Sequence, residues 1–311
     1  MPETVRVIRG GREEIYLISE ERGDGLLLLR PQSPAVPAPP REPAQSDVAA
    51  SPVRAAASEA ILEIRGLTVA YGPKVAVSDV SFQIGLGEIF GLLGPNGAGK
   101  TSTLSAIEGL LEPRSGTVLL DDLDIRRQPA QAKSRMGVQL QATSFQAELT
   151  IKQIVRLYAG LYGVTLSDQQ IAERLREIGL EADADKPFKQ LSGGQQQRLA
   201  LQIAVIHEPD LLLLDEPTAG LDPQSRRQLW GRIEDLRQRG GSILLTTHSM
   251  EEAQAVCDRV AIIDHGQLLT AETPRDLIAK HKDDPRVRQV AHGEVTLEDV
   301  FIGLTGSEIR D

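Results

Sequence analysis

One glycine-rich stretch has the residue types and the spacing that phosphate binding requires. GPNGAGKT occupies residues 94–101 and fits the pattern G-x-x-x-x-G-K-[ST] with Gly94, Gly99, Lys100 and Thr101. Glycines let successive backbone N–H groups converge on a phosphate, and a following helix adds the positive end of its dipole. We expect Lys100 to reach the β- and γ-phosphates of a nucleotide, and Thr101 to place its hydroxyl on Mg²⁺.

The flanks of this stretch favour a phosphate cradle over an ordinary glycine turn. A predicted strand, 88–93, precedes it, and a predicted helix, 101–110, follows it. Strand, loop and helix in that order are the context in which the pattern binds nucleotides. The motif alone does not choose among kinases, GTPases and ATPases. The other loop residues expected to contact the nucleotide are Pro95, Asn96, Gly97, Ala98 and Ser102.

Two acids end an apolar segment further along the chain. LLLLDEP occupies 211–217, and four consecutive leucines are typical of a strand buried on both faces of a parallel sheet. We expect Asp215 to help hold Mg²⁺, directly or through its water. Glu216 is expected to face the γ-phosphate and to orient or deprotonate an attacking water. An Asp-Glu pair at a strand end is by itself a weak signal for a nucleotide site. The phosphate-binding loop upstream makes that interpretation more specific.

A second glycine-containing motif discriminates among the nucleotide-binding classes. LSGGQQQR occupies 191–198 and opens a predicted helix that continues to Ile206. It predicts a second anion-binding helix N-terminus, which a simple kinase does not need. A serine-capped helix would explain Ser192 alone. It would not explain the residues that follow, which are Gly193, Gly194 and Gln195.

These motifs, in this order, make the chain resemble the ATP-binding-cassette (ABC) ATPases over roughly residues 61–269. The resemblance implies ATP as the nucleotide, Mg²⁺ as the metal and an active ATPase. It implies that Tyr71 stacks on adenine and that Gln141, in GVQLQ, touches Mg²⁺ and the attacking water. It places Asp222 in the D-loop AGLD and His248 near the γ-phosphate. The implied catalytic residues are Lys100, Gln141, Glu216 and His248, and the implied metal-binding residues are Thr101, Gln141 and Asp215.

Simpler structural roles compete with several of these assignments. Tyr71 could be an ordinary strand aromatic, and His248 could merely cap a helix. Asp222 precedes a proline and is expected to cap the following helix whatever else it does. Two further glutamines compete with Gln141 for its role, namely Gln139 and Gln146.

The resemblance also implies partners. In this family the signature of one subunit faces the phosphate loop of another, so we expect a homodimer arranged head to tail around two ATPs. One chain is expected to supply Lys100, Thr101, Glu216 and His248, and the other Ser192 and Gly194. Separate multi-spanning permease subunits are expected as well, with the helix at 151–162 receiving one of them, at the cytoplasmic face of the cell membrane.

The C-terminal string TLEDVFIGLTG, 296–306, resembles the drug-exporter branch of the family. Thr296 and Asp299 predict a capping box before an amphipathic helix. An ABC importer ATPase is the closer alternative. A soluble ABC ATPase acting on ribosomes or DNA fits less well, because the chain has one cassette, no long insertion between its motifs and a single cysteine.

The composition excludes several other classes. The 311 residues carry a net charge of −10 and only 3% aromatics, which argues against a nucleic-acid partner. Cys257 is the single cysteine, so an internal disulfide or a multi-cysteine zinc site is excluded. The N-terminus has no signal-peptide core, and no apolar run approaches the ~18 residues of a membrane span. We therefore do not expect a secreted protein or a channel.

Composition also predicts the organisation that must position these motifs. We expect a small β-rich extension at 1–30, a Pro/Ala-rich linker at 31–59, the ATPase domain at 60–280 and an amphipathic segment at 281–311. Within the ATPase domain, strands alternate with helices, which indicates an α/β fold with a mainly parallel core sheet. The resemblance adds an antiparallel β region and a helical subdomain that carries the signature. The strands predicted there are 80–84, 88–93, 117–120, 137–140, 211–215, 242–247 and 260–263.

Overall fold

The computed structural model describes residues 4–9, 12–21, 27–31, 60–139 and 145–306. Its contacts divide the chain into two units, Met1–Ala55 and Ala56–Asp311. The described part of the first unit is an antiparallel sheet of β1 (Thr4–Arg9), β2 (Arg12–Glu21) and β3 (Leu27–Pro31). Short strands were expected near these positions. The proposed linker, apart from Pro31, lies outside the described residues.

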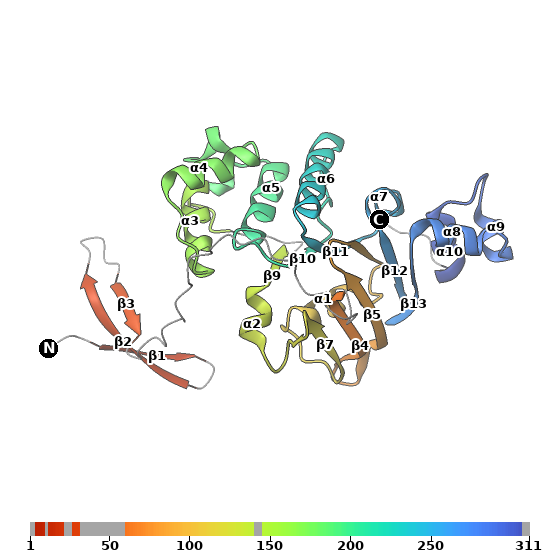
Figure 1. Cartoon of the computed structure of the whole chain (residues 1–311), viewed down its shortest axis with the longest axis horizontal. Coiled ribbons are helices and arrows are strands. Elements are labelled where there is room, and N and C mark those ends of the chain that lie inside the picture. Colours follow the sequence, from red (N-terminus) through yellow and green to blue (C-terminus); the bar gives the residue numbers. More distant parts are fainter. Residues whose placement is uncertain (1–3, 10–11, 22–26, 32–59, 140–144, 307–311) are drawn as a thin grey trace, which may run out of the picture. The chain divides into compact units, whose positions relative to one another are not determined.

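The second unit is built on a mainly parallel sheet, as predicted (Figure 1). Its strand order is β13-β12-β6-β11-β10-β9, and β13 alone pairs antiparallel to its neighbour in these described strands. The central strands β6, β10 and β11 are mostly apolar and buried along their whole length, because an apolar cluster packs on each face of the sheet. The strands are β6 (Ile89–Leu93), β9 (Met136–Gln139), β10 (Leu211–Asp215), β11 (Ser242–Thr247), β12 (Arg259–Asp264) and β13 (Gln267–Glu272).

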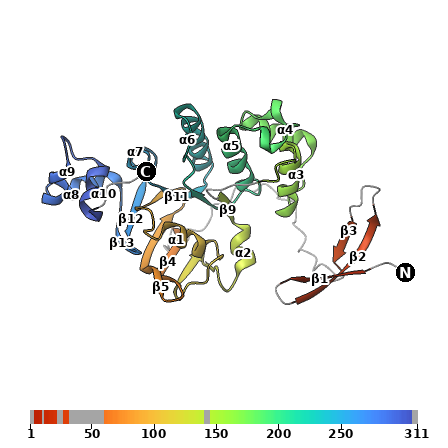
Figure 2. The ribbon, with the colours of Figure 1, turned by 180° about the vertical axis from the view of Figure 1, so that it is seen from behind.

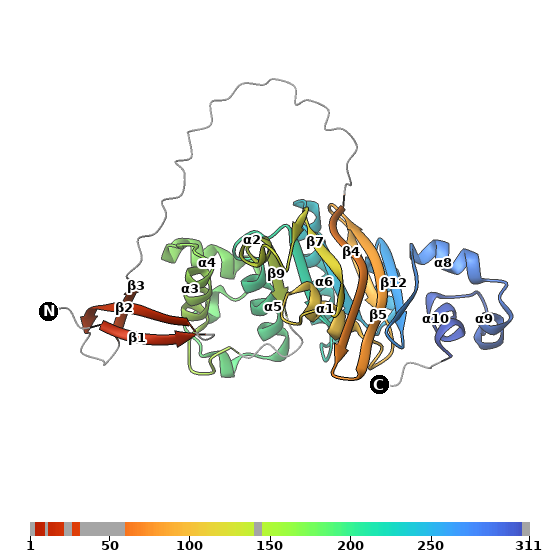
Figure 3. The same ribbon diagram turned by 90° about the horizontal axis from the view of Figure 1, so that it is seen from below.

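An antiparallel sheet in the order β5-β4-β7-β8 accompanies the core sheet (Figure 3). A turn at residues 72–73 joins its two long strands. Helix α1 (Lys100–Ile107) packs between the two sheets, and Leu104 and Ile107 on it are buried in one apolar cluster with residues of both. The strands are β4 (Ala60–Tyr71), β5 (Lys74–Gly85), β7 (Ser115–Leu120) and β8 (Leu123–Asp124).

Helices α3 (Ile151–Leu161), α4 (Asp168–Glu177) and α5 (Gly193–Ala204) share their own apolar cluster (Figures 1 and 2). Each begins with a capping box, in which the cap side chain and the third helical residue satisfy each other's backbone N–H groups. The box at Thr150 confirms the helix start expected at residue 151. The 3₁₀ turns Glu181–Asp183 and Phe188–Gln190 complete this region, whereas the short helix α2 (Pro129–Ser134) lies against β8 and β9.

The C-terminal helices extend the second apolar cluster of the core sheet. Leu297 and Phe301 of α10 (Leu297–Thr305) are buried there with Leu229 and Ile233 of α6 (Pro223–Gln238). The capping box of Thr296 and Asp299 is present, as predicted. No helix in the described ranges is long and apolar enough to cross a bilayer. The remaining helices are α7 (Met250–Val256), α8 (Pro274–His281) and α9 (Pro285–Val290).

One buried carboxyl at the end of α1 makes the stability of this fold depend on pH. Glu108 is 6% exposed, and burial, with the charge of Asp215, raises its pKa to about 7. Between about pH 5 and 7 the folded chain therefore holds a proton that the unfolded chain releases, so stability falls as the pH rises through this window.

We predict that Glu108→Gln removes the loss of stability at high pH, because the amide is neutral at every pH and no charge has to be buried. The variant should be more stable than the wild type at pH 8, by at most about 3 kcal/mol, and should gain little at pH 5. Urea unfolding at the two pH values measures the difference. Glu112→Gln, at an exposed carboxyl, is the control. An equal change in both variants would contradict the assignment.

Candidate nucleotide-binding site

The glycine loop lies between β6 and α1, as the sequence predicted. Gly97 and Gly99 adopt positive φ angles of 81° and 111°, which side chains rarely tolerate. A Cβ on Gly99 would lie 2.7 Å from the carbonyl oxygen of Ala76, and one on Gly94 would collide with that of Ile263. The loop backbone is therefore held closely against its neighbours, and its shape depends on glycine.

Lys100 places its ammonium group within this loop. The side chain is 7% exposed, and Nζ donates hydrogen bonds to the carbonyl oxygens of Gly94 at 2.6 Å and Pro95 at 3.2 Å. Burial lowers the pKa of Lys100, while the charges of Glu216 and Asp215 oppose that shift. The lysine therefore stands at the start of α1 with a positive charge close to two carboxylates.

Tyr71 lies at the edge of the same loop. It is the last residue of β4 and is 52% exposed, and its hydroxyl is 3.4 Å from the Oγ of Ser102 on α1. An exposed aromatic ring beside the helix that follows the glycine loop suits stacking on a nucleobase. Tyr71 is thus a strand aromatic by position, and its ring is also available to a ligand.

A threonine that sequence reasoning missed connects the two acids. Thr246 on β11 lies in register with Asp215 on β10. Its hydroxyl donates to Oδ1 of Asp215 at 2.6 Å and accepts from the backbone N–H of Glu216 at 2.9 Å. The signal for this role was the neighbouring apolar strand that ends in Thr-Thr, but the pairing of the two strands was not known in advance.

Glu216 and His248 meet at the carboxyl edge of the core sheet. Nδ1 of His248 is 3.5 Å from Oε2 of Glu216, although 32 residues separate them in sequence. Glu216 has a positive φ of 46°, an unfavourable conformation for a residue with a side chain. Such strain is common where a side chain is held for function. The two predicted catalytic groups are therefore brought together.

The signature residues begin α5. The hydroxyl of Ser192 accepts from the backbone N–H of Gln195 at 3.3 Å, and Oε1 of Gln195 accepts from the backbone N–H of Ser192 at 2.9 Å. Among the described residues, no hydrogen bond links this motif to the glycine loop of the same chain. A Cβ on Gly193 would meet nothing, so this part of the helix start is open.

Asp222 caps α6, as predicted, and lies near the signature. Its Oδ1 accepts from the backbone N–H groups of Gln224 and Ser225, and its Oδ2 accepts from the Ser225 hydroxyl at 2.6 Å. The same hydroxyl would be 2.6 Å from a Cβ on Gly194. The hydrogen bond from Ser225 lowers the pKa of Asp222. The D-loop and the signature therefore approach each other through Ser225.

The glutamine predicted to sense the nucleotide cannot be placed, because Gln141 lies outside the described residues. Its competitor Gln139 ends β9, in register with Leu214 on β10. Gln139 is 2% exposed, and neither its amide nitrogen nor its amide oxygen has a hydrogen-bond partner in the structure as described. Gln146 is exposed. The assignment of Gln141 stays a prediction.

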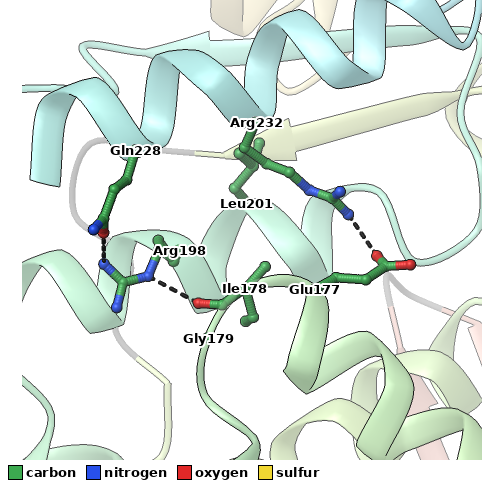
Figure 4. Close-up of a pocket in the computed structure, with 7 residues that line it drawn as sticks. All are labelled: Glu177, Ile178, Gly179, Arg198, Leu201, Gln228 and Arg232. Carbon is green, nitrogen blue, oxygen red and sulfur yellow. Dashed lines mark hydrogen bonds and ion pairs between the residues drawn. The ribbon is translucent and has the colours of Figure 1, made fainter.

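A cavity of about 300 Å³ lies between α5, which carries the signature, the end of α4, and α6 (Figure 4). Arg198, the last residue of the signature string, donates to the carbonyl oxygen of Ile178 at 3.0 Å and to Gln228 at 2.9 Å. Arg232 pairs with Glu177 at 2.6 Å. These contacts join the helical region to α6, which Asp222 caps.

Comparison with known proteins agrees with this arrangement. The family model described as ABC transporter matches residues 77–219. The Nod factor export ATP-binding protein I of Cupriavidus metallidurans is 42% identical over 303 residues, covering 81% of this chain and 99% of that protein. A solved structure described as an ATP-binding subunit of an ABC transporter aligns with a TM-score of 0.69 at 29% identity, covering 78% of this chain and 99% of that one.

The chain belongs to the ABC transporter family of ATP-binding proteins. Another relative is the probable multidrug ABC transporter ATP-binding protein YbhF of Escherichia coli, 38% identical over 248 residues. That alignment covers 79% of this chain, which spans only 42% of that protein's length. One of these two relatives is thus named for export and the other for multidrug transport.

Ser192 offers a test that separates a structural role from a functional one. Ser192→Ala and Ser167→Ala each remove the cap of one capping box, on α5 and α4, and each should cost about 1 kcal/mol of stability. Only Ser192→Ala should also slow ATP hydrolysis, because only α5 carries the signature. Calorimetry and phosphate release measure the two effects. Equal rates of ATP hydrolysis in both variants would show that Ser192 only caps α5.

Proposed function

We propose that this chain is the ATP-hydrolysing subunit of an ABC exporter. In this proposal, ATP closes a head-to-tail pair of these chains, and closure drives export through separate membrane subunits. The observation that carries the catalytic part is the convergence of Lys100, Asp215, Glu216 and His248 on one edge of the core sheet.

The residues present suit Mg²⁺ and a triphosphate. Asp215 offers a carboxylate at the end of its strand, oriented by the Thr246 hydroxyl. Thr101 follows the lysine at the start of α1 and can offer a hydroxyl oxygen, and Mg²⁺ prefers such oxygen ligands. Bound there, Mg²⁺ would neutralise charge on the phosphates. Gly94 and Gly99 leave no room for side chains, because a Cβ there would meet the backbone of Ile263 or Ala76, and this packing keeps the loop in its shape.

We assign a task in ATP hydrolysis to each side chain of this site. The Lys100 ammonium binds the β- and γ-phosphate oxygens and offsets their charge. Glu216 orients the attacking water and accepts its proton. His248, in contact with Glu216, fixes that carboxylate and lies where it can also contact the γ-phosphate. Tyr71 holds the adenine by stacking. Gln141 is proposed to complete the site by contacting Mg²⁺ and the water.

The separation of the two motifs within one chain supports the proposed pair. Ser192, Gly193 and Gly194 open a helix that the same chain does not join to its own glycine loop by hydrogen bonds among the described residues. A second chain could bring this positive helix end to the γ-phosphate. ATP would then hold two chains together, and hydrolysis would release them.

Turnover against protein concentration tests the pair. We expect the rate per chain to fall as dilution separates the chains, because neither site is complete in a monomer. A rate per chain that stays constant down to concentrations at which light scattering finds only monomer would exclude the pair. Adding an excess of Lys100→Met chains, which keep their signature, should raise the rate of dilute wild-type chains.

An exposed apolar group on α3 supports a membrane partner. Leu157 and Leu161 on α3 are 40% and 70% exposed, and Tyr162, directly after the helix, is 40% exposed. A permease was expected to dock on this segment. We propose that they contact the cytoplasmic end of a permease, which would place the chain at the inner face of the cell membrane. Export, rather than import, is supported by the name of the Nod factor export relative and by the string that forms α10.

A further inference from the structure

One buried carboxylate outside the nucleotide site joins the segments that carry its catalytic groups. Glu252 lies on α7, four residues after His248, and is 7% exposed. Its two oxygens contact two different segments. The hydroxyl of Thr218 donates to Oε2 at 2.6 Å, and Nε of Arg226 lies 3.0 Å from Oε1.

The two partners of Glu252 lie in segments that follow Glu216 and Asp222. Thr218 lies in the short link between Glu216 and Asp222. Arg226 lies in the first turn of α6, the helix that Asp222 caps. Glu252 therefore ties the helix after His248 both to the link after Glu216 and to the helix after the D-loop.

Breaking the contacts of Glu252 with Thr218 and Arg226 would cost a large free energy. A buried carboxylate is costly unless it is paired and hydrogen-bonded, and removing one partner leaves its charge uncompensated. A hydrogen bond from a hydroxyl to a carboxylate is among the stronger ones in proteins. The start of α7 cannot shift against Thr218 without losing this bond. The backbone N–H of Glu252 also donates to the Ser249 hydroxyl, the residue directly after His248.

We propose that Glu252 is a positioning residue for ATP hydrolysis, acting through His248. By fixing α7 against the link at Thr218, it keeps His248 in its 3.5 Å contact with Glu216. It touches neither the phosphate loop nor the reacting atoms. This inference rests on the proposed function, because it assigns Glu252 to the hydrolysis that Glu216 and His248 perform.

Glu252→Gln tests this role with little change in size. An amide can keep the contact with Thr218 but cannot pair with the charge of Arg226. We expect kcat to fall about tenfold or more, since small misplacements of catalytic groups are costly, while the KM for ATP changes less than about twofold. Glu251→Gln, the same change at an exposed position of the same helix, should leave both values unchanged.

If Glu252 only stabilised the fold, its replacement would lower the melting temperature, and its effect on kcat would not depend on His248. Glu252→Gln and Glu251→Gln are therefore also made in the His248→Ala protein. In that background Glu252→Gln should lower kcat by less than about twofold, because residues that act as a unit are not additive. A reduction by the same factor with and without His248 would overturn the proposal, as would identical kcat values for Glu252→Gln and Glu251→Gln.

Thr218→Val provides a second variant should Glu252→Gln fold poorly. It keeps the shape of the side chain and removes only the donated hydrogen bond, so it should lower kcat in the same direction, again only while His248 is present. An unchanged kcat in Thr218→Val would count against the proposal. Glu216→Gln distinguishes a failure of the proposed function from a failure of the role assigned to Glu252. If it hydrolyses ATP as fast as the wild type, the proposed function fails, and the role of Glu252 fails with it.

Discussion

Replacing Glu216 by glutamine is expected to lower kcat for ATP hydrolysis by about 10²–10⁴-fold, the usual contribution of a general base. The amide keeps the size of the side chain but cannot accept a proton from water. The affinity for ATP should change little, because Lys100 and the glycine loop are untouched. Phosphate release under saturating ATP measures kcat, and titration calorimetry with Mg²⁺ and ATP measures binding.

Glu251→Gln is the matched control for this experiment, since it removes an exposed carboxylate only three residues beyond His248. The Glu216 variant should also prolong the life of the ATP-bound pair, because the step that removes the γ-phosphate is blocked. A Glu216→Gln protein that retains more than about a tenth of the wild-type kcat would show that another group is the base.

Replacing Lys100 by methionine is expected to weaken ATP binding at least about tenfold and to abolish measurable hydrolysis. The lysine is the nearly buried positive charge of the glycine loop, and charge-assisted hydrogen bonds to phosphate are about twice as strong as neutral ones. Methionine has a similar length and flexibility but no charge. Calorimetric titration of the variant with Mg²⁺ and ATP gives the change in affinity.

Two controls separate binding from folding in the lysine variant. Lys282→Met, at the exposed C-terminal end of α8, should leave ATP affinity unchanged. The melting temperature of Lys100→Met reports the loss of the hydrogen bonds to Gly94 and Pro95. If Lys100→Met bound ATP with wild-type affinity, this loop would not be the phosphate site.

The sequence allowed the local parts of the site to be predicted because their signals are local. The glycine loop, the strand that ends at Asp215 and the cap at Asp222 each need only a few consecutive residues. The parallel core sheet followed from alternating strand and helix patterns. The strands β4 and β13 were missed, because the partly exposed strand β13 and the bulged strand β4 lack a continuous apolar run.

The parts that could not be predicted depend on residues far apart in sequence. Thr246 gains its role only because β11 pairs with β10, and Glu252 only because α7 packs against the link at Thr218. Neither residue belongs to a motif that spacing reveals. The role of Ser192 toward ATP stays a prediction for a different reason: it depends on a second chain.

We propose that this chain drives a separate membrane permease. Tagged Glu216→Gln protein, purified with Mg²⁺ and ATP from native membranes, tests it most directly, with Leu161→Glu and Leu86→Glu versions beside it. Both leucines are exposed, at 70% and 66%, but only Leu161 lies on α3. We predict co-purification of a multi-spanning protein without ATP-binding motifs, lost in Leu161→Glu and kept in Leu86→Glu. A substrate-binding lipoprotein alongside it would instead indicate import. Ribosomal or DNA-bound partners without any membrane protein would contradict the proposed role in transport.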